Sequence, residues 1–322
     1  MMAEASIYER LDTSDISIIL KERIFNSMDT YSQVWGGSRP GCLIFLLDQS
    51  GSMSDPFGGM QAGAGRRKCD MVATVLNGFL NELIVTNTVA QKDGTTEVRP
   101  RAEVTVIGYE SISVGPILAG ELADKTFVSL PELQMNPLDI EGRKRKEIDD
   151  TGQEVEITVP FPVWVKAKAG GGTPMRAALL QARDLAQQWA MNHPDNYPPV
   201  IINVTDGVSS DGDPMGPARE LNAISTSDGH ALLFNVHITD INSAPVAYPA
   251  DKSELPDDKY AHMLFDMSSA IPDSSRTLLE SLLGRSVLPG ARGLIFNGDA
   301  ASVRQMFIFA SVPATQPLDP GR

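Results

Sequence analysis

Apolar runs and segments of helical spacing alternate along most of the chain. Residues 41–47, GCLIFLL, form a continuous apolar run that predicts a strand buried on both faces. A glycine-rich loop then leads to residues 69–83, where apolar side chains recur at the spacing of a helix. Residues 104–109 and 112–118 predict two further strands around a short turn. The chain therefore opens with an α/β pattern.

The same alternation resumes after Thr173 and continues toward the C-terminus. The predicted helices lie over residues 174–191, 217–226, 258–267, 275–283 and 300–309, and the predicted strands over residues 200–205, 231–238 and 293–296. Strands that alternate with helices are typical of a parallel sheet covered on both faces. We therefore predict an α/β fold with a Rossmann-like, doubly wound and mostly parallel sheet. Open sheets of this kind bind ligands at the carboxyl ends of their strands.

Residues 119–169 interrupt this rhythm. The segment holds four prolines, a basic run at residues 143–146 and an alternating stretch at residues 155–165. We interpret it as an insertion that contains a hairpin, and the basic run as a solvated turn rather than a nucleic-acid or targeting patch. The expected organisation is an N-terminal arm over residues 1–38, one domain over residues 39–310 with the insertion at about 119–169, and a disordered tail over residues 311–322.

Composition and charge narrow the function classes. Of the 322 residues, 42% are hydrophobic and 21% are charged, as in an ordinary globular protein with a sizeable core. The formal net charge of −14 disfavours non-specific binding to nucleic acid or to anionic lipid. The longest apolar runs are strand-sized and residues 1–10 lack the pattern of a signal peptide, so we expect no membrane span. Cys42 opens an apolar run, which favours a buried free thiol and a reducing, cytoplasmic location.

Oxygen-bearing side chains cluster where the predicted strands end. Asp48, Ser50 and Ser52 occupy alternate positions of one tight loop directly after the first strand. Two other segments at the same sheet edge add donors: Thr173 stands just before a helix, and Asp206 ends another strand. A set of oxygen donors alone selects a hard cation, so we predict that these five residues bind Mg²⁺ or Mn²⁺.

The three segments resemble the metal-ion-dependent adhesion site of von Willebrand factor A domains. DQSGS at residues 48–52, GGGTP around Thr173 and VTDG around Asp206 occur in the order of that family, each on the expected side of a strand or helix. The resemblance covers roughly residues 39–310, with the segment at 119–169 as an insertion. It implies the fold of these domains and a protein-binding function.

The resemblance also implies a role for each of the five residues. It implies direct bonds to the ion from Ser50 and Ser52, direct or water-mediated bonds from Thr173, and mostly water-mediated bonds from Asp48 and Asp206. Carboxylates that reach the ion only through water neutralise its charge incompletely. An Asp or Glu of a protein partner would therefore complete the octahedron that Mg²⁺ requires. The ion would thus give an acidic protein a local positive charge.

Other polar residues near these segments give weaker signals. Asp211 and Asp213 indicate a solvated turn at the rim of the site. The basic residues 66–68, RRK, either steer an acidic partner or are solvated, and solvation is the default. His237 falls within a predicted core strand, which favours a hydrogen-bonded structural role over catalysis.

Patterns typical of enzymes are absent from the sequence. The glycine-rich loop after the first strand contains no G-x-x-x-x-G-K-[ST], Ser52 is not in a G-x-S-x-G elbow, and the four histidines form no H-E-x-x-H. No nucleophile or acid–base pair emerges by spacing. We therefore expect a metal-dependent adaptor and no catalysis.

The resemblance is strongest to bacterial cytoplasmic members of the family associated with tellurite resistance and stress response. Such proteins tend to accompany a protein kinase and a PP2C-type phosphatase, which makes these the expected partners. Two alternatives stay open. One is a partner subunit of a MoxR-type AAA+ ATPase, and the other is an Mg²⁺-dependent phosphate-ester hydrolase, because a bound Mg²⁺ can serve phosphoryl transfer.

Overall fold

A mostly parallel β-sheet forms the centre of the protein. The computed structural model describes residues 30–57, 66–148, 152–239 and 244–311. The sheet has eight strands in the order β13 (Val246–Ala247), β14 (Leu294–Phe296), β12 (Leu232–His237), β9 (Val200–Thr205), β1 (Gly41–Asp48), β4 (Ala102–Glu110) and β5 (Ser113–Pro116), with β6 (Val128–Ser129) also paired to β4. Only β5, β6 and β13 pair in antiparallel fashion within this sheet. The predicted fold class is confirmed.

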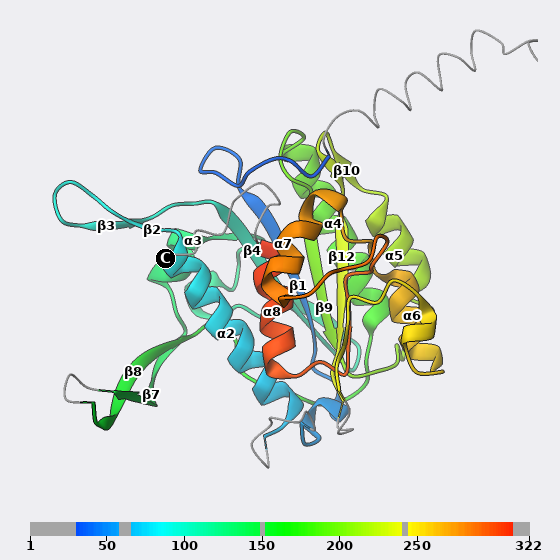
Figure 1. Ribbon diagram of the computed structural model, residues 1–322, viewed down its shortest axis with the longest axis horizontal. Helices are drawn as coiled ribbons and strands as arrows, with labels where there is room; N and C mark the ends of the chain where they lie inside the picture. The colour runs from blue at the N-terminus through cyan, green and yellow to red at the C-terminus, as the bar shows by residue number, and fades with distance from the viewer. Residues whose placement is uncertain (1–29, 58–65, 149–151, 240–243, 312–322) are drawn as a thin grey trace, which may run out of the picture.

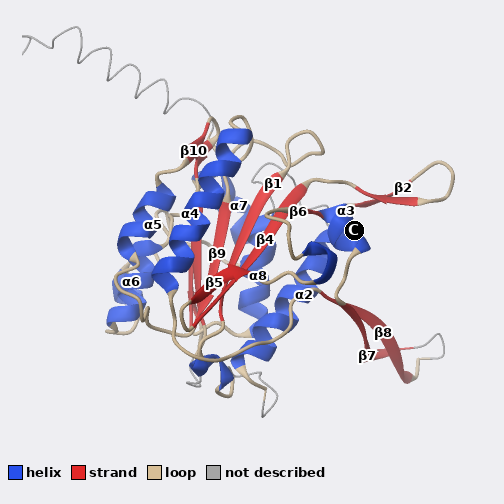
Figure 2. Cartoon of the chain, turned by 180° about the vertical axis from the view of Figure 1, so that it is seen from behind, coloured by secondary structure: helices blue, strands red, loops and turns tan. Residues whose placement is uncertain are grey.

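Helices cover both faces of this sheet. Figure 1 shows one face, which carries α2 (Lys68–Thr86), α7 (Asp273–Leu283) and α8 (Ala300–Ser311). Figure 2 shows the opposite face, which carries α4 (Met175–Asn192), α5 (Met215–Asn222) and α6 (Lys259–Met267). Each of these six helices lies within a few residues of a predicted one. The sheet is therefore doubly wound, as the sequence indicates.

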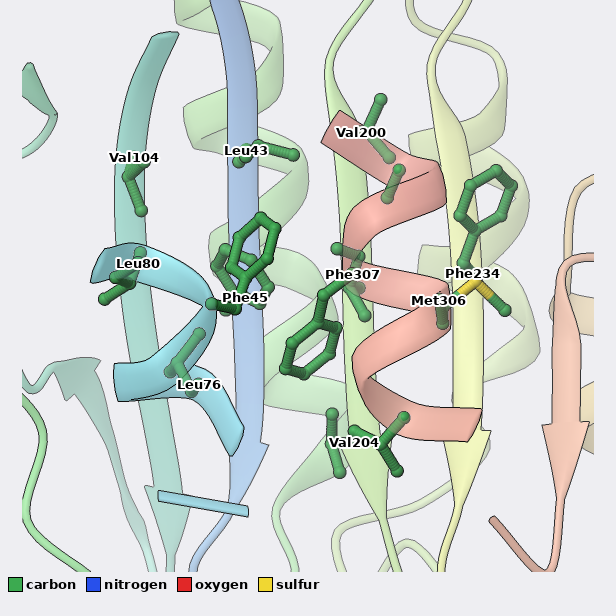
Figure 3. Packing of buried hydrophobic residues seen from close by; sticks show 14 of the residues in the cluster. Leu43, Phe45, Leu76, Leu80, Val104, Val200, Val204, Phe234, Met306 and Phe307 are labelled. Carbon is green, nitrogen blue, oxygen red and sulfur yellow. The ribbon is translucent and has the colours of Figure 1, made fainter. Parts of the chain in front are cut away.

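Side chains of β1 alternate between the two faces of the sheet, as the pleat of a strand requires. Phe45 belongs to the core beneath α2 and α8, whereas its neighbours Ile44 and Leu46 belong to the core beneath α4 and α5. The ring centroid of Phe45 lies 5.1 Å from that of Phe307 on α8 (Figure 3). It lies 5.8 Å from the ring centroid of Phe79 on α2. All eight residues of β1 are buried, which explains its unbroken apolar sequence.

A chain of hydrogen bonds crosses the core beneath the second face. The Tyr109 hydroxyl donates to Asn203 Oδ1 at 2.9 Å, and Asn203 Nδ2 donates to Asn235 Oδ1 at 3.0 Å. Asn235 Nδ2 then donates to Ser268 Oγ at 3.0 Å. Asn203 and Asn235 are fully buried and stand opposite each other in the register of β9 and β12. The chain therefore links β12, β9 and, across the intervening β1, β4 to the end of α6.

The segment at residues 119–169 contains a hairpin, as predicted, of β7 (Asp139–Ile148) and β8 (Glu154–Val163). It projects from the body of the domain (Figures 1 and 2). Other parts of the same segment pack against the domain: β6 pairs with β4, and α3 (Leu130–Met135) contributes buried Leu133. Trp164, 2% exposed, donates from Nε1 to Leu133 O at 2.8 Å. The segment thus both projects from the domain and completes its core.

The basic run at residues 143–146 lies on β7, so the predicted turn is wrong. Its lysines face acids on β8: Lys144 Nζ lies 2.6 Å from Glu156 Oε1, and Lys146 Nζ lies 2.6 Å from Glu154 Oε1. All four side chains are more than half exposed, so these ion pairs add little stability. The run is solvated, as expected, but it is solvated within a strand.

Short elements complete the described part of the chain. They are β2 (Thr88–Ala90) paired with β3 (Thr96–Val98), β10 (Ser225–Thr226) paired with β11 (Gly229–His230), and the 3-10 helices η1 (Gly51–Ser54), η2 (Gly120–Leu122) and η3 (Lys252–Glu254). The end of the predicted arm lies against the domain, because Trp35 is buried and the Tyr31 N–H donates to Asp228 O at 2.6 Å. Residues 1–29 of the arm and residues 312–322 of the predicted tail lie outside the described residues.

Among the described helices, α2 alone has the length and hydropathy of a membrane-spanning helix. Of its apolar window, 56% is buried inside the protein, as expected for the core helix of a globular domain. Both cysteines are buried free thiols, as predicted for Cys42.

Replacing Asn203 tests the buried hydrogen-bond chain. We expect Asn203→Ala to lower the free energy of unfolding by about 2–3 kcal/mol, because Asn235 Oδ1 would lose its donor and the Tyr109 hydroxyl its nearer acceptor. Urea denaturation measures the change. Asn192→Ala, at the exposed end of α4, is the matched control and should stay within about 0.5 kcal/mol of the unmodified protein. Equal effects of the two substitutions would contradict a structural role for the chain.

Candidate metal centre

The carboxyl ends of β1 and β9 bring two of the predicted segments together. The two strands pair in parallel with Leu47 opposite Val204, so Asp48 and Thr205 follow side by side. Asp48 is 2% exposed. Its Oδ2 accepts a hydrogen bond from Thr205 Oγ1 at 2.8 Å, and its Oδ1 accepts one from the Ser50 N–H at 2.8 Å. The Asp48 carboxylate is therefore fixed at the base of the loop.

A row of oxygen atoms continues from Ser50 to Asp206. The Oγ atoms of Ser50 and Ser52 lie 3.2 Å apart, and Ser52 Oγ donates to Asp206 Oδ1 at 2.8 Å. Ser50 is buried, whereas Ser52 is exposed to solvent. Four of the five predicted residues thus form one hydrogen-bonded group that opens to the surface at Ser52.

The glycine-rich loop before Thr173 is bonded to the loop that carries the serines. The Gly51 N–H donates to Gly171 O at 2.9 Å. Gly171 has a φ of +70°, and a Cβ there would lie 1.7 Å from Ser111 Oγ, so its position against the turn between β4 and β5 requires glycine. Thr173 itself is 9% exposed. The structure therefore brings Thr173 to the same sheet edge through its loop.

The loop after Asp206 holds the other side of Thr173. The Thr173 N–H donates to Ser210 Oγ at 2.9 Å, and the Ser210 N–H donates to Thr173 O at 2.8 Å. The Asp211 carboxylate accepts hydrogen bonds from the backbone N–H groups of residues 176 and 177 at 3.0 and 2.8 Å. Asp211 is exposed, as expected for a turn, but it also caps the first turn of α4, a role that the sequence analysis missed.

Asp206 has a second partner that the sequence analysis did not predict. Lys68 Nζ lies 3.0 Å from Asp206 Oδ2, and the two side chains are 5% and 1% exposed. The expectation that residues 66–68 are solvated is therefore wrong for Lys68. Lys68 begins α2 three and four positions before the buried Met71 and Val72, which places it on the buried face of the helix. That spacing is the sequence signal by which Lys68 could have been found.

Burial controls the titration of two side chains at this edge. It raises the pKa of Asp48 to about 6, and the hydrogen bonds from Ser50 and Thr205 oppose the shift. It lowers the pKa of His237, at the end of β12, to about 4, so that His237 is neutral at pH 7. His237 stacks on Phe296 with ring centroids 4.3 Å apart, and its Nδ1 has no hydrogen-bond partner among the described residues. Its structural role therefore depends on stacking and not on a hydrogen bond at Nδ1.

The donor set fits a hard cation. The five residues offer hydroxyl and carboxylate oxygens. In the described ranges, no group of three His, Cys, Asp or Glu side chains could hold a metal, so an ion at this edge would depend on the serine and threonine hydroxyls. Such donors suit Mg²⁺ or Mn²⁺ better than Zn²⁺. Because Asp206 is already paired with Lys68, the site offers an ion little negative charge.

The similarity of this chain to known proteins lies in structure. No protein-family profile matches it, and no curated protein matches it. Among solved structures, the chain is similar to the ArnB paralog VWA2 from Sulfolobus acidocaldarius, with 11% sequence identity and a TM-score of 0.30. The match covers 62% of this chain and 35% of the other, so this chain corresponds to about a third of that protein. A likeness of this size carries no argument about activity or ligands.

Asp48 gives the ion-free protein a specific pH dependence. The pKa of the Asp48 carboxyl group is about 6 in the folded protein, whereas its ordinary value is 3.8. The native state therefore binds this proton more tightly than the unfolded chain does. The contribution of Asp48 to stability is therefore full below about pH 4 and is lost as the pH rises through 6. In EDTA, we expect the unmodified protein to lose about 3 kcal/mol over this window relative to Asp48→Asn, which does not titrate.

Urea denaturation of both proteins at several pH values between about 4 and 7 measures the difference. The comparison with Asp48→Asn cancels the titration of every other carboxyl group. Parallel stability profiles of the two proteins would show that burial does not raise the pKa of Asp48.

Proposed function

We propose that this chain is a metal-dependent protein-interaction module. In this proposal Ser50, Ser52 and Thr173 hold Mg²⁺ or Mn²⁺, while Asp48 and Asp206 orient the waters around it. The observation that carries the proposal is the hydrogen-bonded row of oxygens at the carboxyl ends of β1 and β9, where open α/β sheets bind ligands. The resemblance of the DQSGS, GGGTP and VTDG segments to the adhesion site of von Willebrand factor A domains supports the same function.

The charge of the site favours an acidic partner. Two carboxylates lie among the five residues, and each already accepts hydrogen bonds from the protein. A bound Mg²⁺ would supply a positive charge that these groups neutralise only in part. Ser52 is open to solvent, so an Asp or Glu of a partner would approach from that side. This local charge accounts for the binding of an acidic group by a chain of net charge −14.

For the partner we propose a component of a bacterial stress-response or defence system that includes a protein kinase and a PP2C-type phosphatase. The support for this part is the likeness of the sequence segments to those of tellurite-resistance and stress-associated proteins. A MoxR-type AAA+ ATPase is the alternative partner. Two buried free thiols agree with work in a reducing compartment such as the cytoplasm.

Metal binding can be measured through stability. With Mg²⁺ about a hundredfold above its Kd, we expect a stabilisation of about 2.7 kcal/mol, and we expect Ser52→Ala to remove it. Ser54→Ala is the matched control, because Ser54 lies in the same loop and its Oγ donates to Gly51 O at 2.7 Å. Thermal melts in Mg²⁺ and in EDTA report the effect. Coinciding melts of the unmodified protein over the full range of Mg²⁺ concentration would refute the metal site.

Partner binding needs purified candidates from the same organism. The kinase, the phosphatase and the AAA+ ATPase should each be tested in Mg²⁺ and in EDTA. We expect Mg²⁺-dependent capture of one of them by the unmodified protein and by Ser54→Ala, but not by Ser52→Ala. Metal-dependent turnover of a phosphate ester such as p-nitrophenyl phosphate, lost in Asp48→Ala, would identify a hydrolase and contradict the adaptor function.

A further inference from the structure

The buried ion pair of Lys68 and Asp206 lies beside the residues that would hold the metal ion. We propose that the Lys68 ammonium competes with the divalent cation for the Asp206 carboxylate, and thereby sets the affinity of the site for metal. The inference rests on the proposed metal site, and it adds to that site a residue from outside the three sequence segments. Its consequence is a site that binds metal weakly as long as the ion pair is closed.

Both oxygens of Asp206 are engaged by groups of the protein. Oδ1 accepts the hydrogen bond of Ser52 Oγ at 2.8 Å, and Oδ2 lies 3.0 Å from Lys68 Nζ. The Lys68 side chain is 5% exposed and the Asp206 side chain 1%, so salt screens this pair far less than a surface pair. A metal ion that uses Asp206, directly or through water, must displace the ammonium or share the carboxylate with it.

The fold holds the ammonium in this position. The Lys68 N–H donates to Asp55 O at 3.0 Å, which fixes the start of α2 beside the loop of the serines. The next turn of α2 is anchored in the core by buried Met71 and Val72. His237 is close enough to interact electrostatically with both Lys68 and Asp206, but it is neutral at pH 7 and does not replace the lysine charge. The fold therefore keeps the positive charge of Lys68 next to the Asp206 carboxylate.

The two buried carboxylates, Asp48 and Asp206, carry at most two negative charges, whereas a divalent cation and the Lys68 ammonium together carry three positive charges. The ammonium and the metal ion repel each other, and the repulsion grows where water is excluded. The apparent affinity for metal is the intrinsic affinity multiplied by the fraction of molecules in which the ammonium has left Asp206. A partner's carboxylate supplies the missing negative charge, so metal and partner each strengthen the binding of the other. Lys68 thus makes metal occupancy depend on the partner.

The test is Mn²⁺ binding to Lys68→Met, in which a side chain of similar length lacks the charge. Electron paramagnetic resonance of free Mn²⁺ gives the Kd directly. We expect Lys68→Met to bind Mn²⁺ about tenfold more tightly or better than the unmodified protein, because no ammonium has to leave. Arg67→Met is the matched control: it removes the same charge at the adjacent position, where Arg67 is exposed and pairs with Asp70, and its Kd should change by less than about twofold.

Two further measurements keep the test decisive. Lys68→Gln, neutral but able to donate to Asp206, replaces Lys68→Met if circular dichroism shows that methionine disturbs the fold. In EDTA, Lys68→Met should melt below the unmodified protein, and Asp206→Asn in the same chain should recover part of the loss, because the uncompensated buried carboxylate is removed. A Lys68→Met protein that melts with the unmodified protein in EDTA would overturn the ion pair itself.

The outcomes separate this inference from the proposed function. If the unmodified protein binds Mn²⁺ and neither Lys68 variant binds more tightly, the competition is wrong and the metal site stands. If none of the proteins binds Mn²⁺, the metal site fails and the competition fails with it. Tighter binding by both Lys68 variants, with Arg67→Met unchanged, supports both.

Discussion

The parallel pairing of β1 between β4 and β9 is the constraint on which the site depends. A slip of one residue would exchange the two apolar faces of β1 and would separate Asp48 from Thr205. Burial on both sides of the sheet opposes such a slip: the ring of Phe45 packs on Phe307 on one face, and Ile44 and Leu46 lie in the core on the other. The core thus places the first carboxylate of the site before any ligand binds.

The site contains two buried carboxylates that are stabilised in different ways. Asp48 accepts hydrogen bonds from neutral groups, and its raised pKa shows that these bonds offset only part of the cost of burying a charge. Asp206 is paired with a full positive charge on Lys68. One carboxylate is therefore sensitive to pH and the other to competing cations. The same edge of the sheet can respond to two different properties of its surroundings.

Much of the fold follows from local sequence patterns, whereas part of the site does not. The prediction for residues 200–205 coincides with β9, because five of its six side chains are β-branched, which favours a strand. The basic run on β7 was assigned to a turn because alternation is hard to see when every side chain carries the same charge. The Asn203–Asn235 bond depends on the register of two strands that are distant in sequence. The pairing of Lys68 with Asp206 depends likewise on how α2 meets β9, and helical spacing alone indicates that Lys68 is buried but not what it contacts.

The loop that follows Asp206 is bonded to the start of α4, because Ser210 is bonded to Thr173 and Asp211 caps the first turn of that helix. Asp206 and α4 are therefore joined by a short, doubly anchored connection. A helix of 18 residues is about 27 Å long. The linkage therefore ties the position of Asp206 to a helix whose other end, at Asn192, lies at the opposite edge of the sheet from the candidate metal centre.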